Sequence, residues 1–364
     1  MLGETVLRRR TRFCLVALAV VCSVAAKARE VRADGEIVLA APMSGPYART
    51  GAAMRDAAEA RLAGSLPLAV ADDRCDAQSA LEAAHRIAAA KPALVIGHPC
   101  SSAAIAAAPV YAAAQIPFIS TGARHADLTD KRAGPLVFRL AGRDDRQGKD
   151  AAAFLARASG GRPIAILHDR TFAMSTIAGD AATALTGPPG QAPLHKVMQF
   201  PYVASELNYD ALVEKVVAFA GGPYGLGSIL FAGFPSEAII VLRSLRARGV
   251  SAPFLGVDAV ATNEIGAALA TKLGDVFVLL SADDAQSVAL RTAAACAMWQ
   301  TAGKKTAADP GAALAGLALN DSALGRITFD AKGDADIPSY SVSAWRDGAW
   351  KPAAAPGADK SNLP

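Results

Sequence analysis

Two short polar segments, each following an apolar run, carry side chains suited to holding a small anion. Ser101 and Ser102 follow ALVIGHPC (93–100) and open an alanine-rich helical run that extends to about residue 114. The free N–H groups of a first helical turn and a serine hydroxyl form a site that suits a carboxylate. The alternative is a plain helix cap, with either serine at the N-cap position and no ligand.

The second segment, TGAR (121–124), follows the apolar run PFIS (117–120). Gly122 lacks a Cβ and would let the backbone come close to a ligand. Arg124 offers a planar cation for a second carboxylate. The alternative for Arg124 is a solvated side chain that contacts no ligand.

Three further loops supply candidates of other kinds. Phe234 follows ILFA (229–232) and would point toward a cleft between two lobes. Asp258 follows FLG (254–256) and would either hold a ligand ammonium or cap a helix that we expect from residue 263. Tyr47 lies in the turn-rich segment 42–51, where it would form part of a pocket rim or only of a surface turn.

The sequence carries no recognised signature of catalysis or of metal binding. It has no G-x-S-x-G, H-E-x-x-H, P-loop or G-x-G-x-x-G motif. Asp72, Asp73 and Asp76 lack the ligand ladder of a calcium site, and the five histidines lack zinc spacing. We therefore expect a protein that is not an enzyme and that uses no metal and no cofactor.

Alternating strands and helices position these loops. Buried strands at 37–41, 68–71, 93–97 and 117–120 alternate with helices at about 51–63, 76–90 and 101–114. This pattern is typical of a parallel sheet with helices on both faces, in which ligands bind at the carboxyl ends of strands. After a break at 136–150 the alternation restarts and continues to about 280. The expected fold class is α/β, with two doubly wound parallel-sheet lobes joined by a multi-segment hinge.

We expect the two lobes to be built from discontinuous parts of the chain. The segment after 281 is too short for a third domain, so we place it back on the first lobe. The expected N-terminal lobe is 34–143 plus 281–345, and the expected C-terminal lobe is 144–280. Residues 351–364 are rich in proline and alanine and should form a disordered tail.

Residues 1–28 are typical of a secretory signal peptide. Arg8 to Arg12 form a basic region, Phe13 to Ala26 are apolar, and Ala26-Lys27-Ala28 is a cleavage pattern, with Ala33 as a second candidate. The apolar run is too short for a confident membrane span. We therefore expect a monomer in the periplasm.

The net charge of +4 belongs to this leader, which holds five basic and one acidic side chains. Its removal leaves 32 basic and 32 acidic residues, without the basic excess that nucleic-acid binding requires.

Cys75 and Cys100 each follow a predicted strand and are the expected disulfide in an oxidising compartment. The bond would stabilise the fold by roughly 3 kcal/mol in the chain-entropy model. The alternative is two free thiols. Cys296 lies in an apolar helical run and should be buried and inert.

From about Ile37 to Trp350 the chain resembles the periplasmic leucine/isoleucine/valine-binding proteins of ABC transporters. The similarity is most specific in DDRCD (72–76) and IGHPCSS (96–102), and extends to MSGP (43–46) and FDAKGD (329–334). The resemblance implies the type I periplasmic-binding fold, with two lobes that close on a ligand and three crossing segments. It also implies delivery of the ligand to ABC permease membrane subunits.

The resemblance also assigns roles to particular residues. Ser101 would bind the ligand carboxylate, and the position of Gly122, next to Ala123, would offer a carbonyl to the ligand ammonium. Asp258 would pair with the same ammonium in place of the usual glutamate.

Besides Asp258, four positions depart from the family pattern. Thr50 stands where an aromatic residue is expected. Arg124 stands where a threonine is expected, Phe234 replaces a tyrosine, and Phe172 lies where a Tyr-Gly element is expected. The carboxylate half of the site is thus retained and the rest is altered, so the ligand identity stays open.

The sequence therefore predicts the solute-binding receptor of an ABC importer, with an amino acid or related small carboxylate as ligand. One alternative is the ligand-sensing module of a regulatory system with the same fold. A hydrolase is the other alternative, and the missing nucleophile motif argues against it.

Overall fold

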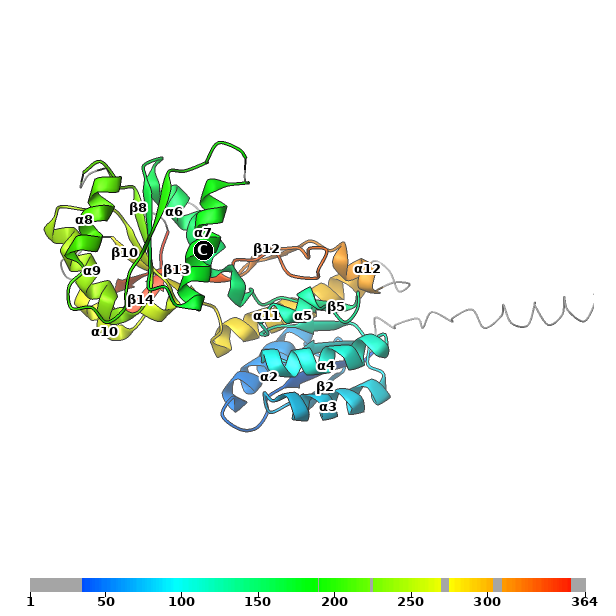
Figure 1. Cartoon of the computed structure of the whole chain (residues 1–364). Coiled ribbons are helices and arrows are strands. Elements are labelled where there is room, and N and C mark those ends of the chain that lie inside the picture. The colour runs from blue at the N-terminus through cyan, green and yellow to red at the C-terminus, as the bar shows by residue number, and fades with distance from the viewer. Residues whose placement is uncertain (1–34, 189, 223–224, 270–274, 304–309, 355–364) are drawn as a thin grey trace, which may run out of the picture.

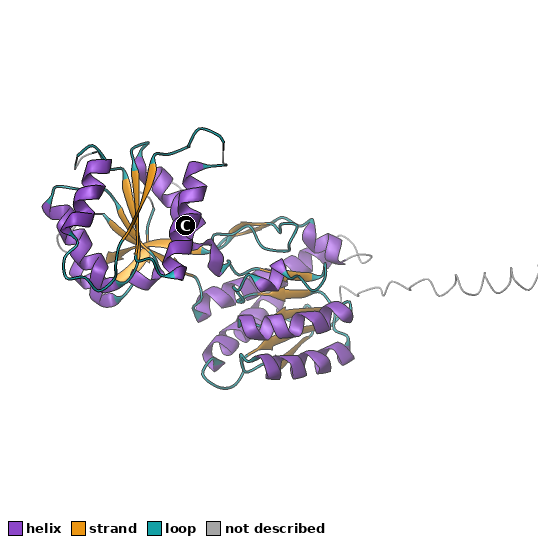
Figure 2. Ribbon diagram, in the orientation of Figure 1, coloured by secondary structure: helices purple, strands orange, loops and turns teal. Residues whose placement is uncertain are grey.

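The structure is a computed structural model that describes residues 35–188, 190–222, 225–269, 275–303 and 310–354. The expected signal peptide, 1–28, and residues 355–364 of the expected tail lie outside the described residues. Figure 1 shows two lobes joined by several crossing segments, and Figure 2 shows that each lobe is a sheet flanked by helices.

The first lobe contains a five-stranded parallel sheet in the order β2-β1-β3-β4-β5. The strands are β1 (Ile37–Ala41), β2 (Leu68–Asp72), β3 (Leu94–Gly97), β4 (Phe118–Ser120) and β5 (Val137–Arg139). Its helices are α2 (Ala48–Leu62), α3 (Ala77–Ala90), α4 (Ser101–Ala113), α5 (Asp127–Asp130), α11 (Ala285–Gly303) and α12 (Pro310–Ala315).

Apolar side chains cover both faces of this sheet because successive residues of a strand point to opposite sides. In β1, Leu39 packs with Met54 of α2 and Trp299 of α11. The neighbouring Val38 packs instead with residues of α3 and α4, among them Tyr111. Helices therefore lie on both faces and leave the strand ends as the accessible edge.

The second lobe contains a seven-stranded sheet in the order β14-β13-β10-β9-β8-β6-β7. The strands are β6 (Ile164–His168), β7 (Val197–Pro201), β8 (Ser228–Ala232), β9 (Phe254–Gly256), β10 (Val276–Ser281), β13 (Tyr340–Arg346) and β14 (Ala349–Pro352). Its helices are α6 (Gln147–Ser159), α7 (Phe172–Thr186), α8 (Asp210–Phe219), α9 (Pro235–Ala247) and α10 (Asn263–Leu269). A small antiparallel pair, β11 (Leu319–Asp321) and β12 (Gly325–Ile327), follows α12.

The expected return of 281–345 to the first lobe is wrong for its last part. Strand β13 pairs antiparallel with β10 of the second lobe, with Phe277 opposite Ala344. The hairpin of β13 and β14 covers an edge of β10 that would otherwise expose unpaired backbone groups. For the same reason residues 351 and 352 belong to β14 and not to a disordered tail.

Three crossing segments meet at the hinge between the lobes. They run from β5 into α6, from β10 into α11, and from about residue 335 into β13. Ser339 Oγ accepts a hydrogen bond from the Arg143 amide at 2.9 Å, and Tyr340 donates to the Asp144 carbonyl at 3.2 Å. A Cβ at Gly142 would lie 2.3 Å from Ser339 Cα, so the first and third segments touch backbone to backbone. Among the described helices, none combines the length and the apolar character that a membrane crossing requires.

Candidate ligand-binding site at facing strand ends

The loops that carry Ser101, Phe172 and Phe234 lie where the strand order reverses in each sheet, whereas Arg124 and Asp258 follow the next strands, β4 and β9. In the first lobe the chain continues from β1 to β2 on one side and then to β3 on the other. In the second lobe it continues from β6 to β7 on one side and then to β8 on the other. Ligands of open α/β sheets bind in the crevice at such a reversal, beyond the carboxyl ends of the strands. Ser101 follows β3, whereas Phe172 and Phe234 follow β6 and β8.

Ser101 is the first residue of α4, and Cys100 occupies the N-cap position without a side-chain cap. The expectation that Ser101 or Ser102 caps this helix is therefore wrong. Ser101 Oγ instead accepts hydrogen bonds from the amides of Arg124, at 3.0 Å, and His125, at 3.1 Å. A hydroxyl has two acceptor sites and one donor. Both acceptor sites are used here, so the hydroxyl hydrogen is left for an acceptor outside this loop, while Ser102 lies exposed in the same first turn.

The loop before α4 is fixed by a disulfide and a buried polar chain. The predicted Cys75–Cys100 bond is present, with the two Cα atoms 5.3 Å apart. His98 is fully buried, with Nδ1 2.9 Å from Asp73 Oδ2 and Nε2 2.8 Å from the Tyr111 hydroxyl. Burial and the nearby Asp73 charge raise the pKa of Tyr111 far above its ordinary value. The sequence revealed no partner for His98, because Asp73 and Tyr111 approach it only in the fold.

Gly122 is needed for a different close approach from the one predicted. A Cβ at this position would lie 2.6 Å from Pro99 Cα, so the glycine makes room for the neighbouring loop. Its predicted approach to a ligand stays a prediction. Ala123 points its methyl group into the core of the first lobe, and its amide donates to Ser120 Oγ at 3.3 Å. The carbonyl role that the resemblance assigns to this loop stays a prediction.

Arg124 is buried, with 8% of its surface exposed, and the alternative of a solvated arginine is wrong. Its Nη1 donates to Asp283 Oδ1 at 3.0 Å and to the Ser339 carbonyl at 2.9 Å. The guanidinium carbon lies 4.6 Å from the centre of the Tyr340 ring. The side chain thus extends from the end of β4 to two of the three crossing segments of the hinge.

Three aromatic candidates are exposed at the strand ends. Phe172 begins α7 and is 89% exposed, while Phe234 is the N-cap residue of α9 and is 44% exposed. On the first lobe, Tyr47 immediately precedes α2 and is 54% exposed. Exposed apolar rings on surfaces that can face one another are typical of an interaction site.

Asp258 is exposed at the start of a 3₁₀ turn, Asp258–Val260, and its Oδ1 accepts from the Ala259 amide at 2.8 Å. It does not cap α10. Thr262 has that role, because its hydroxyl accepts from the Ile265 amide at 3.2 Å.

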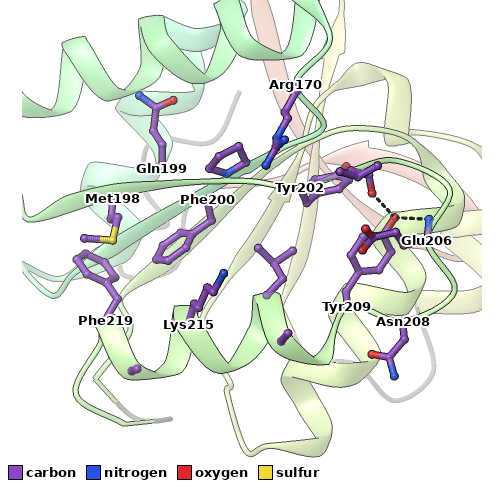
Figure 3. Close-up of a pocket in the computed structure, with 15 residues that line it drawn as sticks. Arg170, Met198, Gln199, Phe200, Tyr202, Glu206, Asn208, Tyr209, Lys215 and Phe219 are labelled. Atoms are coloured by element: carbon purple, nitrogen blue, oxygen red, sulfur yellow. Dashed lines mark hydrogen bonds between the residues drawn. The ribbon is translucent and has the colours of Figure 1, made fainter.

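The cavity in Figure 3 is separate from these residues. It has a volume of about 720 Å³ and lies within the second lobe, between β7 and α8. Its lining includes Phe200, Tyr202, Tyr209, Lys215 and Phe219, and none of the predicted binding residues. The predicted residues instead follow strands of the two lobes, with Ser101 and Arg124 in the first lobe and Phe234 and Asp258 in the second. Within the described ranges, no group of acidic, histidine or cysteine side chains could hold a metal ion.

The remaining free cysteine of the described chain, Cys296, is buried in α11, and burial raises its pKa to about 12. This agrees with the inert thiol that we expected.

Two α/β lobes with three crossings and candidate loops at the strand ends define a two-lobed binding protein. Residues 36–321 match the model of the periplasmic binding protein family, and the chain belongs to that family. The predicted family resemblance and fold class are confirmed. The family is one of binding proteins, in agreement with our expectation that the chain is not an enzyme.

Three similar proteins illustrate the relationship. The chain is 30% identical over 262 residues to an amino acid binding protein of Pseudomonas aeruginosa, covering 69% of this chain and 67% of the relative. It is 26% identical over 381 residues to the Leu/Ile/Val-binding protein homolog 1 of Brucella suis, covering 94% and 97%. A crystal structure of a putative branched-chain amino acid ABC transporter from Rhodospirillum rubrum superposes with a TM-score of 0.65 at 20% identity, covering 87% and 99%.

Proposed function

We propose that this protein is an extracytoplasmic receptor that binds an amino acid or a related small carboxylate between its lobes. It then delivers this ligand to the membrane subunits of an ABC importer. It would act as a monomer in the periplasm after removal of the leader at Ala28 or Ala33. The names of the relatives support this class of ligand, since they refer to amino acids and to leucine, isoleucine and valine.

The observation that carries the proposal is the environment of Ser101. The first-turn amides of α4 have no partner within the helix, and the helix dipole adds positive potential at the same point. Both acceptor sites of the Ser101 hydroxyl are filled by the amides of Arg124 and His125, and no described residue accepts its hydrogen. A carboxylate would accept hydrogen bonds from all of these donors, which are charge-assisted and therefore strong.

The loop is held rigidly before any ligand arrives. Cys100 is tied to Cys75, and His98 is held between Asp73 and Tyr111. A preformed set of donors loses little conformational freedom on binding, so more of the interaction energy appears as affinity.

Closure of the hinge would bring the second lobe to the same ligand. Phe172 and Phe234 would then lose contact with water. Each ring that becomes fully buried would stabilise the closed form by roughly 1.5–3 kcal/mol. A ligand that contacts both lobes binds the closed form more tightly than the open form and therefore shifts the equilibrium toward closure.

Titration calorimetry on the purified mature protein tests the proposal. A panel of amino acids, aliphatic acids and aromatic acids should include a ligand that binds the wild type and that Ser101→Ala weakens. Ser65→Ala is the matched control, because Ser65 Oγ is also hydrogen-bonded but lies between α2 and β2, at the amino end of the strand and not at its carboxyl end. No binding by any member of the panel, or equal losses in the two variants, would contradict the carboxylate site.

The protein that binds the receptor distinguishes an importer function from a sensing function. Copurification with ABC permease subunits, and stimulation of their ATPase by the loaded receptor, support import. Capture of a signalling protein without a permease would instead favour the sensing module.

A further inference from the structure

The polar groups around Ser101 present more unsatisfied donors than acceptors. Arg124 connects Ser101 with the hinge, because its amide donates to Ser101 Oγ and its guanidinium donates to Asp283. One of its terminal nitrogens, Nη2, is buried and has no hydrogen-bond partner among the described residues. A buried donor without an acceptor is costly, which makes this nitrogen a candidate to meet a ligand.

A second buried arginine lies beside the same loop. Arg291 of α11 is 3% exposed, and its Nε donates to the Thr121 carbonyl at 2.6 Å. Its Nη2 is also buried without a partner in the described part of the chain. Burial is the main reason that its pKa is lowered to about 10, with attraction to Asp283 opposing and repulsion from Arg124 adding to that shift.

The nearby side-chain acceptors are largely engaged. Asp283 accepts from Arg124, and Asp150 Oδ2 accepts from the amides of Ser339 and Tyr340 at 3.1 and 3.0 Å. The acceptor that could favour a cation is Asp258 of the facing lobe, which is exposed and accepts from the amide of its own neighbour. The described side chains fixed beside Ser101 thus offer mainly donors. The competing carboxylate is that of Asp258 on the second lobe, whose charge acts on Tyr340 beneath Arg124.

This imbalance bears on the chemistry of the ligand. An ammonium group has three donors and no acceptor, and on the carbon next to a bound carboxylate it would approach Arg124. It would add a further cation to a partly buried pair of cations, where screening by water is weak. A ligand with only acceptors or apolar groups at this position meets no such conflict.

We infer that the cleft selects small organic acids that carry no ammonium group beside the carboxylate, and that Arg124 sets this selectivity. The inference rests on the proposed function and narrows its ligand class. The apolar remainder of the acid would lie against the exposed rings of Phe172, Phe234 and Tyr47.

Matched pairs of ligands test the inference by titration calorimetry on the mature protein. Each pair consists of an amino acid and the same acid without its amino group: leucine with 4-methylpentanoate, and phenylalanine with 3-phenylpropanoate. Benzoate and succinate distinguish an aromatic from a second-carboxylate preference. In at least one pair the wild type should bind the deaminated acid about tenfold more tightly or better, the value of one charge-assisted hydrogen bond.

Arg124→Thr should lower that ratio about tenfold by weakening the deaminated acid. Arg86→Thr is the matched control, because Arg86 is exposed on α3, and it should leave the ratio unchanged. Circular dichroism checks folding, and Arg124→Gln replaces the threonine variant if that variant is unfolded. Tighter or equal binding of the amino acids by the wild type, or an unchanged ratio in the folded Arg124 variant, overturns the inference and leaves the receptor function standing. Binding of no acid and no amino acid overturns the proposed function itself.

Discussion

Loss of the Cys75–Cys100 disulfide should destabilise the first lobe and loosen its carboxylate site together. The two cysteines are 25 residues apart in the sequence, and Cys100 directly precedes α4. In the chain-entropy model a closed loop of this length stabilises the folded state by about 3.5 kcal/mol at 25 °C. Most of this loss arises in the unfolded chain, whose entropy the bond restricts. In the folded state Asp73 and Tyr111 still hold His98, but Cys100, directly before α4, loses its covalent attachment.

The first lobe has the size at which 1 kcal/mol shifts the unfolding temperature by about 2–4 °C. Reduction should therefore lower its midpoint by about 7–14 °C. Hydrogen exchange followed by mass spectrometry separates the lobes: peptides from β3 and α4 should lose protection, while peptides from β8 serve as an internal reference. Calorimetry on the same samples should show weaker binding of the ligand, because the first turn of α4 is less firmly held.

The double variant Cys75→Ser/Cys100→Ser provides the control. It should behave like the reduced wild type, and a reductant should change it no further, since Cys296 is already a free, buried thiol. An unchanged midpoint for the reduced wild type, or an equal effect of the reductant on the double variant, would refute the reasoning.

Three further predictions concern single side chains. Ser101→Ala should weaken the bound carboxylate by about 1.5–3 kcal/mol in calorimetry, through loss of a charge-assisted hydrogen bond; an unchanged Kd would contradict it. His98→Leu should lower the free energy of unfolding by about 3 kcal/mol in urea titrations, because it leaves Oδ2 of the buried Asp73 without its partner while Oδ1 keeps only the Cys75 amide; a neutral result would show that this contact is dispensable. Hydrogen bonding to Arg143 is the main reason that the pKa of Asp130 lies well below its ordinary value. The unfolded chain therefore takes up this proton first as the pH falls, so the stabilisation is present above about pH 4 and is lost below it. Arg143→Gln should therefore reduce the fall of the urea unfolding midpoint with decreasing pH between about pH 5 and pH 3. An unchanged pH dependence would count against the role of the Arg143–Asp130 pair.

The sequence predicted those parts of the fold that depend on short-range pattern. Apolar runs bounded by polar turns located the strands, and the alanine-rich run after Cys100 located α4, which begins at Ser101. The spacing of strands and helices predicted two parallel sheets, because a parallel connection needs a helix between its strands. The position of Cys75 and Cys100 after strands favoured their pairing, because parallel strands end at the same edge of a sheet. In the structure β1 lies between β2 and β3, and the bond joins the loops that follow these two strands.

Only the tertiary structure decided which distant segments meet. Strand β13 has the alternation of any half-exposed strand, and nothing local shows that it completes the second sheet and not the first. The same limit applies to Arg124, whose partners Asp283 and Ser339 lie 159 and 215 positions away. A short apolar or charged pattern fixes how a segment folds and which face it buries. Which distant segments it contacts depends on where the chain returns after crossing the hinge, and the packing of the whole fold decides this.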